Sequence, residues 1–342
     1  MKILYAVQGT GNGHLSRAKD IYTVLNNRVE VDVLISGKQY EIDVPFPVKF
    51  RRRGIVFVFG KNGGIDYLKT LKANNIFKII KEIRSCKLSE YDLIINDFEP
   101  ITAWASYFRG DLNCISLSHQ GAFLSKKVPK PKRKSVLGRL VLKYFAPSAT
   151  TYSFHFKKYD KNMFLPIIRN DIRRQSIKEK NYYVVYLPFY SDEKIIKVLS
   201  KIKGVKWKVF SKHSKEDYRV KNVKIIPICS SNFERNMAWS NGVICGAGFE
   251  TPAEALYLKK KLLVVTMKKQ YEQACNAESL KQLGVIVLSS FNKKMVPSIL
   301  QWIESDTIIN VDFPDRTQFI IDEIITNHIV ATELSERLLQ NI

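Results

Sequence analysis

Residues 3–15 read ILYAVQGTGNGHL, a short apolar run, a glycine-rich turn and the start of a helical pattern. The run 3–7 is typical of a buried strand, and helical spacing begins at Leu15. Glycines at such a junction let the backbone approach a ligand closely, and the N-terminus of the helix attracts anions. We therefore take this stretch as the first unit of a doubly wound sheet.

The same alternation of apolar strands and helical segments continues through both halves of the chain. Strands of this kind form parallel sheets covered by helices, so we predict an α/β protein with two Rossmann-like domains facing across a cleft. The domains are predicted as 1–167 and 168–342, with 317–339 as one or two closing helices that are able to pack back on the first domain. The predicted strands are 3–7, 31–36, 55–59, 91–96, 114–117, 182–187, 207–210, 223–228, 243–245, 262–266 and 285–288. The predicted helices are 15–25, 67–85, 192–202, 232–239, 251–258 and 271–283.

The length and charge of the chain limit what it can be. A chain of 342 residues is too long for one compact core and suits two domains. It carries 55 Lys and Arg against 32 Asp and Glu, a net charge of +23. This excess predicts an anionic partner, which the charge alone leaves open between nucleic acid, a phosphorylated ligand and an acidic membrane surface.

The cysteines and apolar segments indicate a location. The 5 cysteines are scattered, without a C-x-x-C pair, as expected of reduced thiols rather than a zinc site or a disulfide frame. The first apolar run is too short for a secretory signal, and no segment has the roughly 20 apolar residues of a bilayer span. We expect a cytoplasmic protein, either free or peripheral on the inner face of the cytoplasmic membrane.

A strongly basic segment runs from Lys126 to Arg139 and reads KKVPKPKRKSVLGR. Its prolines predict an extended loop in the first part. The segment is either a solvated loop or a basic arm that contacts anionic lipid head groups, with residues 136–145 as an interfacial helix. The sequence favours neither reading.

The glycine turn after the first strand carries a candidate catalytic residue. Its spacing, G-x-G-x-G-H, departs from the dinucleotide fingerprint, and no acidic residue follows the second strand, so NAD binding is disfavoured. His14 lies at the predicted helix N-terminus, where the positive end of the helix dipole favours the neutral imidazole that a general base needs. A histidine that merely packs the turn is the alternative.

Asp97 strengthens the catalytic reading of His14. It ends the predicted fourth strand, which neighbours the first strand at the switch point of a doubly wound sheet. Asp97 can therefore hold the imidazole by its second nitrogen. Glu99 competes for either role, or serves as a helix-start carboxylate before Pro100.

The second half contains a longer signal, CGAGFETPAEA at residues 245–255. A strand again ends in a glycine turn, and Pro252 suits the first turn of the next helix. Free amides there and the Thr251 hydroxyl are suited to hold a diphosphate, and Glu254 could accept both hydroxyls of a ribose. After the next strand, residues 267–277 read MKKQYEQACNA, whose polar groups at a loop–helix junction suit sugar hydroxyls.

These two loops resemble those of glycosyltransferases with the GT-B fold. The nearest likeness is to the group of the peptidoglycan enzyme that transfers N-acetylglucosamine to a lipid-linked acceptor, together with the galactolipid synthases. It rests on the glycine loop ending in His14, the spacing from Gly248 to Glu254, and the pattern Gln273-x-x-Asn276. The stretches DFEP and FETPAE resemble a little-characterised bacterial branch of these enzymes.

The resemblance implies that the N-terminal domain binds the acceptor and that the C-terminal domain binds a nucleotide-diphosphate sugar. It favours uridine as the base, with no cofactor and no bound metal. It assigns Glu254 to the donor ribose, 248–251 to the diphosphate, and Glu272 with Gln273 to the donor sugar. The sequence departs from the peptidoglycan enzyme at 187–192, LPFYSD, where that enzyme has a glycine-rich phosphate loop. The predicted catalytic residues are His14, Asp97 and Glu99. The predicted donor-binding residues are Gly246, Gly248, Phe249, Glu250, Thr251, Glu254, Gln270, Glu272 and Gln273. The predicted acceptor-binding residues are Gly11, Asn12, Gly13, His119 and Gln120.

The predicted function is an inverting, metal-independent transfer of a sugar to a hydroxyl of a lipid-linked or glycan acceptor, with His14 as base. Two alternatives remain. A sugar-nucleotide 2-epimerase shares the architecture, but its usual G-T-R-P-E run is replaced here by Gly9-Thr10-Gly11-Asn12. A charge-driven nucleic-acid-binding protein is the other, although the basic residues are dispersed and no nucleic-acid motif occurs, so no specific nucleic acid is expected.

Overall fold

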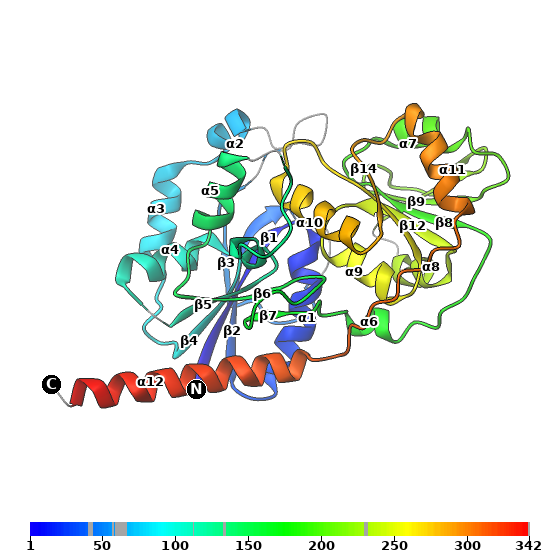
Figure 1. Ribbon diagram of the computed structural model, residues 1–342. Coiled ribbons are helices and arrows are strands. Elements are labelled where there is room, and N and C mark those ends of the chain that lie inside the picture. The colour runs from blue at the N-terminus through cyan, green and yellow to red at the C-terminus, as the bar shows by residue number, and fades with distance from the viewer. Residues whose placement is uncertain are drawn as a thin grey trace.

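The computed structural model describes residues 1–39, 44–56, 58, 67–111, 113–132, 135–228 and 232–340. In this part of the chain, two sheets of seven strands each form the centres of two α/β units (Figure 1). The predicted fold class, two Rossmann-like halves, is confirmed.

The first sheet has the order β3-β2-β1-β4-β5-β6-β7, and all its pairings are parallel. Along β1, Ile3, Tyr5 and Val7 join the core on the side of α1, while Leu4 and Ala6 pack on the opposite side. The strands are β1 (Lys2–Thr10), β2 (Glu30–Gln39), β3 (Phe50–Arg52), β4 (Leu93–Asp97), β5 (Cys114–Ser118), β6 (Thr150–Phe154) and β7 (Met163–Phe164).

The third strand differs from the prediction of 55–59. Pairing with β2 ends at Arg52, and Gly54 then turns the chain with φ +61°. The amides of Val56 and Val58 are bonded by the side chains of Asn74 and Thr70 instead of by a neighbouring strand. Side chains thus bond the backbone of this run, although its residues have a strong β propensity. Residues 57 and 59 lie outside the described part.

The second sheet has the order β10-β11-β9-β8-β12-β13-β14, parallel except for β10. Six of its strands fall where the apolar runs predict them, and the short β10 is added at the edge. The strands are β8 (Tyr183–Tyr186), β9 (Trp207–Ser211), β10 (Tyr218–Val220), β11 (Val223–Pro227), β12 (Gly242–Gly246), β13 (Lys261–Val265) and β14 (Ile286–Leu288).

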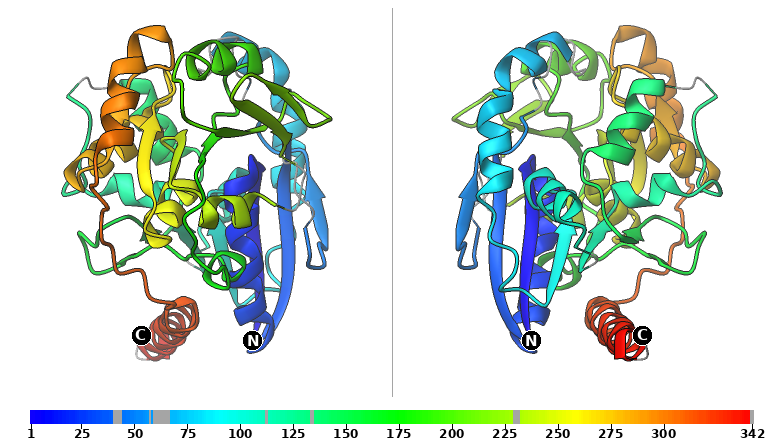
Figure 2. Two further views of the ribbon diagram at one scale, coloured as in Figure 1. Left: turned by 90° about the vertical axis from the view of Figure 1, so that its right-hand side faces the viewer. Right: turned by 90° about the vertical axis from the view of Figure 1, so that its left-hand side faces the viewer.

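Helices cover both faces of each sheet (Figures 1 and 2). The predicted helix 67–85 is two helices, because Asn74 bonds the neighbouring segment and Asn75 caps a new helix. The helices are α1 (Asn12–Asn26), α2 (Tyr67–Ala73), α3 (Ile76–Arg84), α4 (Pro100–Arg109), α5 (Val136–Tyr144), α6 (Asn170–Arg173), α7 (Asp192–Leu199), α8 (Phe233–Trp239), α9 (Glu250–Tyr257), α10 (Tyr271–Gln282), α11 (Val296–Glu304) and α12 (Thr317–Gln340), with 3-10 turns η1 (Gln120–Leu124) and η2 (Lys293–Met295).

The C-terminal helix α12 returns to the first half of the chain. It lies along the lower edge of the first sheet in Figures 1 and 2, next to α1. Ile320, Ile321 and Ile324 are buried there, and Arg28 forms an ion pair with Asp322. The chain therefore crosses between the two halves twice.

A continuous apolar core joins the two halves. Phe154 and Phe156 of the first half and Phe249 and Ala253 of the second belong to one cluster of buried side chains. Shared apolar burial of this kind holds the two halves in a fixed arrangement.

Among the described residues, no helix combines the length and the apolar character needed to span a bilayer.

Candidate active site

A cavity of about 560 Å³ lies between the two halves, at the carboxyl ends of the central strands. This is where open α/β sheets place their ligands. From the first half it is lined by Thr10, Gly11, Asn12, Gly13, His14, Arg17, His119 and Gln120. From the second half it is lined by Tyr186, Pro188, Phe189, Lys212, Cys245, Gly246, Gly248, Phe249, Glu250, Thr251, Pro252, Met267, Gln270, Glu272 and Gln273.

His14 and Asp97 meet as the strand order predicts. Val7 pairs with Asp97 across β1 and β4, and the Nδ1 atom of His14 lies 2.8 Å from Asp97 Oδ1. Although burial alone would raise the pKa of the Asp97 carboxyl, the charges of Arg17 and His14 hold that pKa below its ordinary value. A carboxylate only accepts hydrogen bonds, so in the neutral imidazole Nδ1 carries the proton and Nε2 the lone pair. Nε2 faces Gln120 Nε2 at 3.3 Å, on the cavity side.

The residue that follows Asp97 has a strained backbone conformation. Phe98 has φ 56°, a left-handed conformation that bulky residues rarely adopt. Its ring is parallel to the His14 imidazole, with centroids 6.4 Å apart, and stacks on Phe145 at 4.8 Å. Strain of this kind often occurs at functional sites, where the surrounding packing enforces it.

Arg17 is a central residue that the sequence reasoning missed. It is 1% exposed, and its guanidinium donates to both Asp97 oxygens at 2.8 and 2.7 Å. The same group contacts Glu250 of the second half. A charged residue on the buried face of α1, between Leu15 and Ala18, was the signal available in the sequence.

Glu250 lies at the start of α9 and faces the first half. Burial raises the pKa of its carboxyl to about 7, against the opposing effect of Arg17. A Cβ atom on Gly13 would lie 3.3 Å from Glu250 Cγ, so the glycine turn makes room for this side chain. Glu250 is therefore a titratable group of the cavity that changes charge near neutral pH.

Three helix N-termini converge on the cavity. The helices α1 and α9 begin without a side-chain cap, after Gly11 and Phe249, and both starts line the cavity. Their first amides are unpaired within the helix and carry the positive end of the dipole. Nothing lies within 4 Å of a Cβ built on Gly248, so the turn before α9 is open to a ligand. This is the geometry of an anion site.

The third helix start, that of α10, carries the predicted sugar-binding residues. Gln270 caps it, with its side-chain oxygen 2.7 Å from the Gln273 amide nitrogen. The Gln273 side chain accepts from the Met267 amide at 3.2 Å, which fixes its orientation. Burial raises the pKa of the Glu272 carboxyl, against the opposing effects of His14 and Gln120 from the first half. These groups all line the cavity, as predicted.

Three predicted residues, Asp97, Glu99 and Glu254, do not line the cavity. Asp97 holds His14, which does line it, and the structure gives the other two different contacts. Glu99 is fully buried and caps α4, accepting from the amides of Ile101 and Thr102 at 2.7 Å. The helix-start alternative therefore describes it. Glu254 is 2% exposed and both its oxygens bond Arg169, at 2.5 and 3.0 Å. Its carboxylate is occupied by a cation from the interdomain segment, so the geometry disfavours the predicted ribose contact.

His119 lines the cavity and also connects the two halves of the chain. Its ring stacks on Phe249 with centroids 3.8 Å apart, and its Nε2 lies 2.7 Å from Asn276 Oδ1 of the second half. Burial lowers its pKa well below the ordinary value. His119 thus belongs to the joint between the halves, at the floor of the cavity.

The remaining residues that the sequence reasoning missed come from the ends of β8 and β9. Tyr186, Pro188 and Phe189 line the cavity where the sequence departs from the phosphate loop of the peptidoglycan enzyme, and Lys212 adds a cation. The ammonium of Lys212 lies 5.1 Å from the centre of the Phe189 ring.

Within the described residues, no group of three or more His, Cys, Asp or Glu side chains is placed to hold a metal ion.

Comparisons with known proteins identify the family. The profile of Glycosyl transferase family 1 matches residues 1–303, so the chain belongs to this family and is a glycosyltransferase. The prediction of an enzyme of this kind is confirmed. No curated protein sequence matches the chain.

Solved structures share the fold. MurG of Acinetobacter baumannii has a TM-score of 0.57 and 12% identity, covering 95% of this chain and 99% of that one. UGT2 of Phytolacca americana, complexed with UDP-2-fluoro-glucose and pterostilbene, has a TM-score of 0.56 and 12% identity, covering 94% and 93%. The spinosyn forosaminyltransferase SpnP has a TM-score of 0.55 and 13% identity, covering 99% of both chains. At such identities the likeness concerns the fold alone, and it confirms the predicted GT-B architecture.

Proposed function

We propose that the enzyme transfers a sugar from a nucleoside-diphosphate donor to an acceptor hydroxyl, with the cavity between the two halves as its site. The observation that carries this proposal is the meeting of an Asp97-bound His14 with the open N-terminus of α9 across one cavity of about 560 Å³. A base and an anion site from opposite halves are what such a transfer requires.

His14 acts as the general base. Its Nε2 lone pair accepts the proton of the acceptor hydroxyl as the oxygen attacks the anomeric carbon, and the bond to the diphosphate oxygen breaks. Asp97 holds the ring by Nδ1 and stabilises the imidazolium that forms. A single displacement of this kind inverts the configuration at the anomeric carbon.

The departing nucleoside diphosphate is stabilised by the second half. The unpaired amides at the start of α9, the Thr251 hydroxyl and the Lys212 ammonium line the cavity where its negative charge develops. These groups supply the charge stabilisation without a metal ion. UDP is the first nucleotide to test, because UGT2 was solved with a UDP-sugar analogue.

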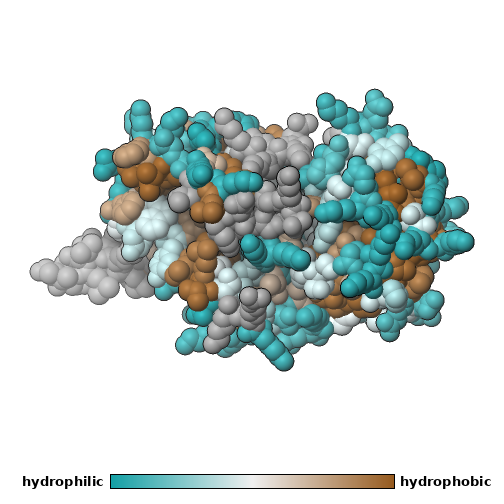
Figure 3. All heavy atoms as spheres, turned by 90° about the horizontal axis from the view of Figure 1, so that it is seen from above, coloured by the Kyte–Doolittle hydropathy of each residue, from teal (hydrophilic) through white to brown (hydrophobic). Residues whose placement is uncertain are grey.

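The acceptor is a lipid-linked or glycan hydroxyl that approaches beside α5. This helix packs on α10 so closely that a Cβ on Gly138 would lie 2.4 Å from Tyr271 Cβ, one residue from the cavity-lining Glu272. Its outer face exposes Val136 at 70% and Leu140 at 47%, next to the basic segment. Figure 3 shows brown apolar patches among teal side chains on both halves of the molecule. Such a face suits the surface of an anionic membrane.

The donor is tested by calorimetric titration of UDP, dTDP, GDP and ADP, with and without EDTA. We expect one nucleotide to bind in both conditions. Gly248→Val, which fills the open turn before α9, should weaken this binding at least about tenfold, because the side chain occupies the place of the diphosphate. Thr307→Val, a substitution at an exposed residue outside the cavity, is the control. Binding that survives Gly248→Val unchanged, or binding of no nucleotide, contradicts the proposed donor site.

The membrane contact is tested by sedimentation with vesicles containing phosphatidylglycerol or only phosphatidylcholine. We expect the protein to bind the anionic vesicles, and Val136→Ser/Leu140→Ser to release it. The double variant Ile308→Ser/Val220→Ser, at exposed apolar residues of the second half, is the control. Equal loss in the two double variants rejects α5 as the contact.

A further inference from the structure

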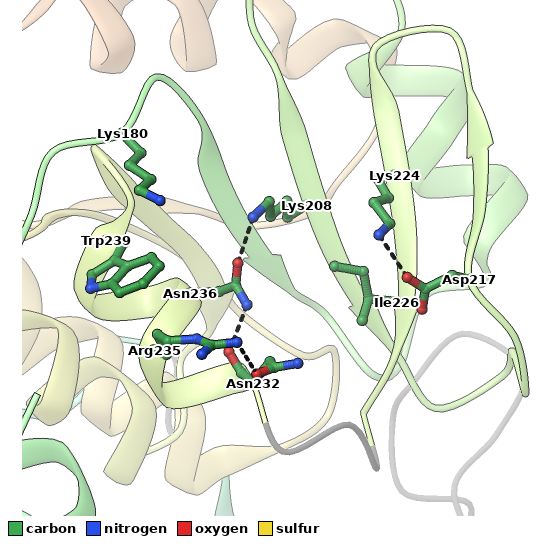
Figure 4. A pocket seen from close by; sticks show the side chains of 9 residues that line it. All are labelled: Lys180, Lys208, Asp217, Lys224, Ile226, Asn232, Arg235, Asn236 and Trp239. Atoms are coloured by element: carbon green, nitrogen blue, oxygen red, sulfur yellow. Dashed lines mark hydrogen bonds and ion pairs between the residues drawn. The ribbon is translucent and has the colours of Figure 1, made fainter.

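A second cavity, of about 320 Å³, lies in the second half and shares no lining residue with the cavity between the halves. Figure 4 shows its walls, which come from β9, β11 and α8, with Lys180 from the segment before β8 closing one side. Lys208 and Lys224 point into it from the two neighbouring strands.

The charge of this cavity is strongly positive. Among the described residues, four cationic side chains line it, Lys180, Lys208, Lys224 and Arg235, and Asp217 is the single acidic side chain in the lining. Asp217 pairs with Lys224 at 2.7 Å. Three cationic groups therefore remain without a carboxylate among the residues that line the cavity.

Contacts with uncharged groups orient Lys180, Lys208 and Arg235, and these contacts leave their positive charges in place. Lys208 donates to Asn236 Oδ1 at 2.6 Å, and its ammonium lies 3.9 Å from the centre of the Tyr182 ring. Lys180 and Arg235 lie 4.1 and 5.4 Å from the centre of the Trp239 ring. Amide and aromatic contacts orient the charges and leave them available to an anion.

The cations also destabilise one another. Burial lowers the pKa of Lys208, and the charges of Lys224, Lys180 and Arg235 lower it further. An anion bound among them would relieve this repulsion. A concave site with several converging cations matches a group with two or more negative charges better than it matches a single carboxylate.

We propose that this cavity binds the phosphate or diphosphate group of a small ligand, at a site separate from the catalytic one. The group would lie among the three cations without a carboxylate partner, Lys208 on β9, Arg235 on α8 and Lys180 before β8. The enclosing walls favour a compact group over an extended polymer. The phosphate source is either a soluble metabolite or a lipid head group, and the two are separated by experiment.

The test uses inorganic pyrophosphate as the probe in 150 mM salt, with binding followed by calorimetry and by the indole ¹⁵N–¹H signals of the full-length protein. We expect the signal of Trp239 to shift on saturation, while that of Trp104 on α4 stays in place. Lys180→Gln/Arg235→Gln should weaken the binding that shifts Trp239 at least about tenfold, because each removes a charged hydrogen-bond donor. An unmoved Trp239 signal at saturating pyrophosphate overturns the proposal.

The control is Lys197→Gln/Lys201→Gln, which removes the same charge. Lys197 is exposed on α7, whose buried residues pack on the opposite face of the sheet, and Lys201 follows it. We expect less than about a twofold change here, since only the long-range field is altered. Equal weakening in both double variants shows a charge effect without a site and rejects the proposal. Vesicles with phosphatidic acid identify a lipid source if they compete with pyrophosphate at Trp239, and a soluble source if they do not.

Discussion

Replacing Arg17 by methionine should destabilise the protein far more than removing an exposed ion pair would. Arg17 and Asp97 are 1% and 0% exposed, and two hydrogen bonds of 2.8 and 2.7 Å join them. Methionine fills a similar volume without a charge, so the substitution leaves the Asp97 carboxylate buried with only His14 as partner. It also removes the cation that faces Glu250.

The magnitude follows from the two carboxylates that lose their partner. Breaking a buried pair by removing one member typically costs about 3–5 kcal/mol, because the remaining charge stays unpaired. Glu250 adds little, since its pKa of about 7 already lets it take up a proton. We therefore expect the free energy of unfolding at pH 7 to fall by about 3–5 kcal/mol, measured by urea denaturation followed by circular dichroism. Arg17→Lys keeps the charge but loses the fork geometry, so its loss should be smaller.

The matched control lies on the same helix. Lys19 forms an ion pair with Asp171 at 2.8 Å, also between α1 and a later segment, but the two side chains are 42% and 48% exposed. Lys19→Met should cost at most about 0.5 kcal/mol, as exposed pairs do. If Arg17→Met destabilises the protein no more than Lys19→Met does, the buried network is not a source of stability and the reasoning is refuted.

Three further predictions concern the cavity and its walls. His14→Gln should lower kcat by about 10²–10⁴ and leave nucleotide affinity within about threefold, because only the base is lost; His213→Gln, at an exposed histidine outside the cavity, should change neither, and equal effects would exclude His14 as the base. The folded state raises the pKa of Glu250 from 4.5 to about 7, so it binds more protons than the unfolded chain between these values, and stability should fall by about 3 kcal/mol as pH rises through this window. In Glu250→Gln this fall of the unfolding free energy with pH should be absent. If the variant shows the same dependence of unfolding free energy on pH between 4.5 and 8 as the parent, the raised pKa is contradicted. Gly138→Ala places a Cβ 2.4 Å from Tyr271 Cβ, so α5 must shift, and unfolding should be easier by about 1–3 kcal/mol; a variant as stable as the parent would mean that the helices can move apart freely.

The sequence predicts the parts of this site that lie within one strand–turn–helix unit. The turns at residues 8–14 and 245–251 have local signals, namely a buried apolar run, glycines and a helix start, and the structure places both at the cavity. The meeting of His14 with Asp97 was also predictable, because the first and fourth strands are neighbours in the strand order 3-2-1-4-5-6 that is common in doubly wound sheets. The order of the strands therefore predicts this contact between two side chains that are far apart in the sequence.

The contacts between the two halves were not predictable in this way. Arg17 bonds Glu250 across 233 residues, and Arg169 bonds Glu254 across 85, and no periodicity records which charged residue faces which. The expected ribose contact of Glu254 depended on the carboxylate being unoccupied, which a single sequence does not encode. The strand expected at 55–59 had the right composition, but side chains from α2 and the segment after it bond its backbone. Tertiary partners thus override local propensity.

The joint between the halves bears on how the donor reaches its site. Arg17 to Glu250, His119 to Asn276 at 2.7 Å and His155 to Ser279 at 2.9 Å all cross it, within a shared apolar core. A wide opening of the two halves would expose these buried polar groups and the aromatic contacts around them, each at a cost of about 1–3 kcal/mol or more. A cavity of about 560 Å³ is already within the range of preformed ligand sites, so opening is not needed to create space. We therefore expect the donor to enter a largely preformed site, and the base and the anion site to keep their relative positions because Arg17 ties α1 to α9.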